Sequence, residues 1–124
     1  MENSIRLKRV LICNAVFSAI AGLLMIILNS QFVQIFGIVN GLVFYILGPG
    51  LILFGIDVAY VAIKQINNPK RVKGISFMDF GWVLGSLIII VTTAFNLSWI
   101  GYELIGIVAA IVFTFGFLQL KFNR

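Results

Sequence analysis

Four long apolar stretches, separated by short polar connections, dominate the pattern of this chain. They cover about residues 10–28, 41–63, 77–95 and 100–120. Each is close to the ~20 residues that an α-helix needs to cross about 30 Å of hydrocarbon. A backbone in lipid must satisfy its own hydrogen bonds, so helices are expected rather than open strands. The pattern predicts an all-α, polytopic membrane four-helix bundle that forms a single domain over residues 1–124.

The composition supports a membrane protein and removes several kinds of chemistry. Hydrophobic residues make up 61% of the chain and charged residues 10%, whereas soluble domains contain about 25% charged residues. The chain has one cysteine and no histidine, which removes disulfide frameworks, zinc sites and Cys/His nucleophile pairs. We therefore expect no metal ion and no cofactor.

The basic residues indicate how the spans are oriented. All nine lysines and arginines lie at one set of span ends, and the other two connections carry none. They are Arg6, Lys8 and Arg9 before the first span, Lys64, Lys70, Arg71 and Lys73 between the second and third, and Lys121 and Arg124 after the fourth. By the positive-inside rule, both termini and the central connection are cytoplasmic. The positive charge thus reflects topology and attraction to anionic headgroups, and no nucleic-acid partner is expected.

The second apolar stretch carries small residues at a spacing that suggests close helix packing. Gly41, Gly48 and Gly55 are seven residues apart and continue to Ala62, which places them on one helix face. A second face holds Gly50 and, at the same spacing, Asp57 and Lys64. Small residues let helices approach closely in lipid, where the hydrophobic effect does not drive association. We expect neighbouring helices to pack against both faces of this helix.

Pro49 interrupts the same stretch near its middle. It cannot donate a hydrogen bond to the carbonyl of Tyr45, which should bend the helix and free an acceptor inside the membrane. One interpretation is a kink that only improves packing, which membrane helices tolerate. The other is a hinge, or a carbonyl at Tyr45 that binds an ion or ligand.

Polar residues in the spans form the candidate binding site. Counted from the cytoplasmic boundary, Asn14, Asp57, Asp79 and Gln119 all fall in the inner third of their spans. Charged groups inside a membrane are rare and often functional. The candidate binding residues are Asp57, Asp79, Asn14, Trp82, Ser86 and Tyr45. The Gly81-x-x-x-Gly85 pattern in the third span is a separate candidate for helix dimerisation.

The two inner carboxylates have structural interpretations as well. Asp79 lies close to the predicted start of the third span, where a carboxylate can cap the first amides of a helix. Asp57 is expected to be the more deeply placed of the two and to pair with a cation, with Lys64 or Arg9 the favoured partner.

Polar positions on three spans resemble those of small uncharacterised bacterial four-helix integral membrane proteins. The positions are Asn14-x-x-x-Ser18-x-x-x-Gly22, Asp79-x-x-Trp82-x-x-x-Ser86 and Gln119. The resemblance implies the same topology and a location in the bacterial inner membrane. It implies nothing about chemistry, because that family has no assigned function.

Three classes of function remain, and the sequence favours them to different degrees. An enzyme is the least favoured, because only Asp57 and Asp79 could form a catalytic pair. An accessory or assembly protein acting through small-residue helix faces is favoured, with a second copy or another membrane protein as partner. The alternative is a binder or carrier of a small hydrophobic molecule, lipid or ion that uses the inner polar residues. In every case the lipid bilayer surrounds the chain.

Overall fold

The chain is all-helical in the residues that the structure describes. This computed structural model describes residues 2–37, 41–92 and 97–123. The helices are α1 (Glu2–Ile27), α2 (Asn29–Phe36), α3 (Leu42–Lys64), α4 (Pro69–Thr92) and α5 (Trp99–Phe122). All of them except α2 are long and apolar enough to cross a membrane. Within the described residues, four helices are thus long and apolar enough to cross a membrane, as the sequence predicts.

The observed helices extend beyond the predicted spans at the basic end. α4 begins at Pro69 rather than near residue 77, and α1 already begins at Glu2. Hydropathy detects only the part of a helix that lies in lipid, so polar helical turns outside it are missed. Proline also suits the first position of a helix, because its fixed φ is helical and its missing N–H would have no partner there. The predicted end of the third span, at 95, lies outside the described residues.

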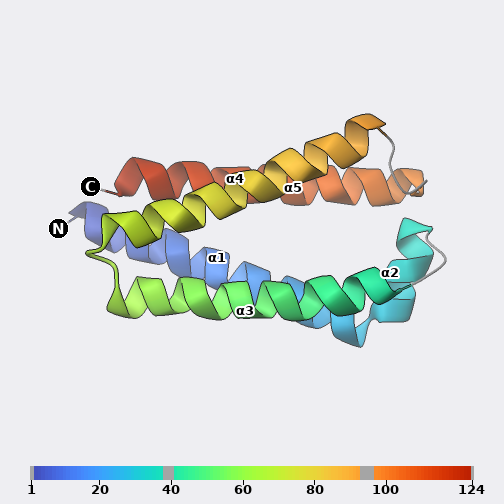
Figure 1. Cartoon of the computed structure of the whole chain (residues 1–124), viewed down its shortest axis with the longest axis horizontal. Helices are drawn as coiled ribbons and strands as arrows, with labels where there is room; N and C mark the ends of the chain where they lie inside the picture. The colour runs from blue at the N-terminus through green and yellow to red at the C-terminus, as the bar shows by residue number, and fades with distance from the viewer. Residues whose placement is uncertain (1, 38–40, 93–96, 124) are drawn as a thin grey trace.

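The four long helices pack as two antiparallel pairs joined through α1. α1 packs along α3, α4 packs along α5, and α1 also contacts α5, whereas α3 and α4 touch only slightly. Figure 1 shows both termini and the connection at 65–68 at one end of the molecule, called here the terminal end. The helix that links the two pairs is therefore α1, and not the glycine-rich helix that the sequence places between neighbours.

The short helix α2 was not predicted and covers the other end. It ends at Gly37, whose φ of 70° is left-handed and closes the helix with a bond from its N–H to Val33. The rings of Phe32 and Phe36 each pack against Phe44 at the start of α3, with centroids 5.3 Å apart. The backbone N–H of Ser98 donates to the Phe36 carbonyl at 2.7 Å. α2 thus ties the beginnings of α3 and α5 together.

The main apolar core lies toward the terminal end, where three of the long helices meet. Its buried members are Leu7, Leu11 and Ala15 of α1, Val58, Val61 and Ala62 of α3, and Val72 and Ile75 of α4. Lipid is as apolar as this core, so the helices gain from close packing there rather than from leaving water.

Glycines on α3 allow the close approach of α1. A Cβ on Gly55 would lie 2.8 Å from the Ala15 carbonyl oxygen, and one on Gly48 would lie 2.7 Å from Cγ1 of Ile26. A Cβ on Gly41 would collide with the Asn29 side chain. The face defined by the seven-residue spacing therefore lies against α1 and α2.

At the other glycines singled out by the sequence, no other part of the described chain packs closely. Nothing lies within 4 Å of a Cβ built on Gly50, Gly81 or Gly85. The second face of α3, where neighbouring helices were expected, is thus open at Gly50. α3 continues as one helix through Pro49, whose side chain is exposed, and Figure 1 draws α3 as one uninterrupted helix.

We predict that a large side chain at Gly55 lowers the stability of the protein and that one at Gly50 does not. Gly55→Leu should destabilise the protein by about 1–3 kcal/mol, because the side chain must push α1 away. Gly50→Leu is the matched control on the same helix and should unfold like the unaltered protein. Thermal unfolding in mild detergent, followed by circular dichroism, measures both. Equal stability of the two variants would contradict the packing of α1 on α3.

Candidate functional site

Five polar side chains from three helices are buried together in the protein interior. This polar cluster consists of Asn14 and Ser18 on α1, Ser76 and Asp79 on α4, and Gln119 on α5. None of them is more than 5% exposed. Asn14 and Ser18 are four residues apart, and Ser76 and Asp79 are three apart, so each pair shares one helix face.

Hydrogen bonds join these side chains across the three helices. Nδ2 of Asn14 donates to Oδ2 of Asp79 at 3.0 Å and to Oε1 of Gln119 at 2.8 Å. Nε2 of Gln119 donates to the same Asp79 oxygen at 2.9 Å and to Oγ of Ser76 at 3.2 Å. Ser18 donates through Oγ to Oδ1 of Asn14 at 3.3 Å.

Within the polar cluster, every N–H donor of the two side-chain amides has a hydrogen-bond partner. Each primary amide of Asn14 and Gln119 has two N–H donors, and both donors of each are used within the cluster. An unpartnered buried donor or acceptor costs about 1–3 kcal/mol, so each member holds the others in place. The arrangement fixes how α1, α4 and α5 meet.

Asp79 does not cap a helix, contrary to the sequence-based prediction. α4 begins at Pro69, ten residues earlier, which places Asp79 in the interior of the helix with 2% exposure. Its oxygen accepts from the neutral amides of Asn14 and Gln119. No ion pair reaches it among the residues that the structure describes. A carboxyl group placed this way inside a membrane span is a candidate functional group.

Asp57 pairs with a cation, but with a different one from those predicted. Nη2 of Arg71 lies 2.5 Å from Oδ1 of Asp57, and Nε of Arg71 donates to Oε1 of Gln65 at 3.0 Å. Lys64 and Arg9 were the expected partners. Asp57 is also the less buried carboxylate, since its side chain and that of Arg71 are each 41% exposed. Arg71 reaches it because the first turn of α4 directly follows the short connection from α3.

The remaining candidate residues lie partly at the polar cluster and partly away from it. Trp82 and Ser86 follow Asp79 on the same face of α4, and Ser86 is 6% exposed. The Trp82 indole Nε1–H is buried and has no hydrogen-bond partner within the described part of the chain. Tyr45 lies on α3, is 52% exposed, and is not brought to the cluster.

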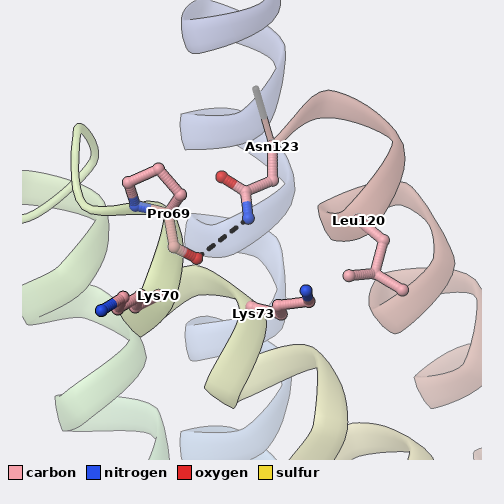
Figure 2. Close-up of a pocket in the computed structure, with 5 residues that line it drawn as sticks. All are labelled: Pro69, Lys70, Lys73, Leu120 and Asn123. Atoms are coloured by element: carbon pink, nitrogen blue, oxygen red, sulfur yellow. Dashed lines mark hydrogen bonds between the residues drawn. The ribbon is translucent and has the colours of Figure 1, made fainter.

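Hollows on the surface of the described residues are lined by other side chains. One, of about 400 Å³, lies between α4 and α5 at the terminal end (Figure 2). Another, of about 460 Å³, follows the exposed side of α1 and includes Lys8, Arg9 and Cys13. Neither is lined by a member of the polar cluster. Within the described residues, no group of three or more His, Cys, Asp or Glu side chains is placed to hold a metal ion.

Sequence reasoning missed Ser76 and Arg71, and for the same reason. Both precede residue 77, where the third span was predicted to begin, so neither was considered as part of a helix. The signal for Ser76 was present, because it lies three residues before Asp79. Gln119 was grouped with Asn14 and Asp79, which it does contact, but it was not named as a binding residue.

We predict that Asn14 and Gln119 are energetically coupled. Removing either amide leaves the other amide and Asp79 with one hydrogen-bond partner fewer. The double variant Asn14→Leu, Gln119→Leu should therefore lose less unfolding free energy than the two single variants lose in sum. The coupling should be about 0.5–3 kcal/mol in a double-mutant cycle on unfolding free energy. Asn14→Leu combined with Asp57→Ala is the control and should be additive. Additivity of the amide pair would contradict the bonded cluster.

A second cycle tests the ion pair between Asp57 and Arg71. Because both groups are well exposed, Asp57→Ala and Arg71→Ala should couple by no more than about 1 kcal/mol. Asp57→Ala with Lys64→Ala should show no coupling. The reverse pattern, with coupling to Lys64 only, would show that the pair seen here is not the one in the membrane. The measurement is again unfolding free energy in mild detergent.

Comparison with protein-family models, with curated proteins and with solved structures finds no match for this chain. The resemblance to small bacterial four-helix membrane proteins therefore stays a prediction. The functional argument has to come from the polar cluster and from the helix faces that the fold leaves open.

Proposed function

We propose that the protein is a non-enzymatic accessory or assembly protein of the membrane, which acts through a small-residue face of α4. The observation that carries this proposal is the contrast between the two sets of glycines. Gly48 and Gly55 are used for close approach inside the chain, whereas Gly81 and Gly85 have open space around them. Glycines exposed on a membrane helix offer a surface for another helix.

The open face of α4 is apolar and suits a second copy of this chain. Phe77, Leu84 and Ile88, which surround Gly81 and Gly85 along the helix, are each more than half exposed. A face that carries small residues at four-residue spacing can pack against itself across a two-fold axis, as symmetric dimers do. α4 contacts only α5 extensively, which leaves this face to a partner.

The chemistry of the carboxylates also favours a non-enzymatic role. Asp79 is held in the polar cluster, and Asp57 is engaged by Arg71. No hydrogen bond or ion pair among the described residues brings the two carboxylates together as a catalytic pair. Their present partners support structural roles, in helix registration and in fixing the connection between α3 and α4.

The proposed setting is a four-helix bundle in the bacterial inner membrane with both termini in the cytoplasm. Support comes from the position of the charges, because the basic residues gather at the terminal end while the α2 end carries none. The positive-inside rule assigns such an end to the cytoplasm. Four apolar helices are compatible with this multi-pass arrangement.

A native mass spectrum of the protein released from mild detergent tests the assembly proposal. We expect a dimer, and we expect the double variant Gly81→Leu, Gly85→Leu to shift it to monomer while the helical circular dichroism stays unchanged. Gly50→Leu, at another open glycine, is the matched control and should remain dimeric. A monomeric unaltered protein, or a double variant that stays dimeric, would contradict the proposed face.

A second candidate function is the binding or carriage of a small hydrophobic molecule, lipid or ion at the polar cluster. The observation that favours it is the buried Nε1–H of Trp82, which lies one turn from Asp79 and has no partner among the described residues. A ligand acceptor would satisfy this donor. In the same mass spectra, a bound small molecule that is lost in Trp82→Phe would favour this candidate over assembly.

A further inference from the structure

The terminal end has more positive charge than its own acidic groups neutralise. Lys64, Lys70 and Lys73 form no ion pair within the described part of the chain. The one described carboxylate that pairs there, Asp57, is used by Arg71. Two of these lysines, Lys70 and Lys73, line the hollow between α4 and α5, together with Pro69, Leu120 and Asn123.

The hollow is built by the first turns of α4 and the last turn of α5. Nδ2 of Asn123 donates to the Pro69 carbonyl at 3.0 Å, which ties the end of one helix to the start of the other. Figure 2 shows this bond, with Lys73 extending toward Leu120 and Lys70 extending to the other side. Lys73 is therefore the cation that faces α5, and Lys70 lies at the margin of the hollow. The hydrogen bond joins the two walls of the hollow.

In the proposed membrane orientation, the hollow lies at the level of the lipid headgroups. It lies where one helix that is long and apolar enough to cross a membrane begins, at Pro69, and another ends, at Phe122. The positive end of the α4 dipole is at the same place and adds to the lysine charges. Leu120 provides an apolar wall beside the cations. Basic pockets between membrane helices at this level suit anionic lipid headgroups.

We propose that this hollow binds the phosphate group of an anionic phospholipid from the adjacent leaflet. Lys73 contacts the phosphate, Lys70 adds charge at the margin, and Leu120 packs against the glycerol and the upper acyl chain. This site is separate from the polar cluster and from the glycine face of α4. It does not depend on the assembly proposal.

The test uses native mass spectrometry of the whole protein in mild detergent, titrated with dioleoyl phosphatidylglycerol. Lys73→Gln should weaken binding about fivefold, which corresponds to about 1 kcal/mol for one basic residue near an anionic lipid. The double variant Lys70→Gln, Lys73→Gln should weaken it by more. Lys64→Gln removes an equal charge at the same end of the protein but outside the hollow, and it should change binding less than twofold.

Two further probes identify the source of the phosphate. Dioleoyl phosphatidylcholine should bind more weakly, because its headgroup has no net charge, and millimolar inorganic phosphate should not displace phosphatidylglycerol. Equal losses for Lys64→Gln and Lys73→Gln would overturn the site in favour of diffuse surface attraction. Displacement by inorganic phosphate would overturn the assignment to a lipid. Because the three lysines are exposed, we expect their replacement to leave the fold unchanged, and circular dichroism of each variant checks this.

Discussion

A polar side chain buried among membrane helices must find its hydrogen-bond partners within the protein, and this constraint organises the structure. Asn14, Asp79 and Gln119 satisfy one another from three different helices. Their bonds connect the pair formed by α1 and α3 to the pair formed by α4 and α5. Direct contact between α3 and α4 is slight. The polar cluster is therefore a buried directional link between the two halves, alongside the more exposed ion pair of Asp57 with Arg71.

The glycine-lined contact between α1 and α3 contributes in a different way. Close packing at Gly48 and Gly55 gives dispersion energy over a long surface. Side-chain hydrogen bonds between membrane helices contribute only about 0.6 kcal/mol each on average. Their larger effect is on specificity, because any rotation of α1, α4 or α5 would leave buried polar groups unpartnered. Packing holds the helices together, and the polar cluster selects one arrangement.

The hydrophobic pattern was sufficient to predict four helices that are long and apolar enough to cross a membrane, because length and apolarity are directly visible in the residues. It could not predict where α4 begins, since Pro69 to Ser76 is helical without being uniformly apolar. Because the start of this helix was placed too late, Asp79 was predicted to cap it. For the same reason, Arg71 was not considered as a partner of Asp57. The seven-residue spacing correctly grouped Gly48 and Gly55. Spacing defines faces but not neighbours, so it could not show that the face with Gly50 is open.

The central claim is that the side chains of α1, α4 and α5 meet at the polar cluster in the membrane. Solid-state NMR of the protein in lipid bilayers can test it through nitrogen–carbon correlations between side chains. We expect the side-chain amide nitrogen of Asn14 to correlate through space with the carboxyl carbon of Asp79 and the side-chain carbonyl carbon of Gln119. Correlations of Asn14 with residues of α1 alone would contradict the account.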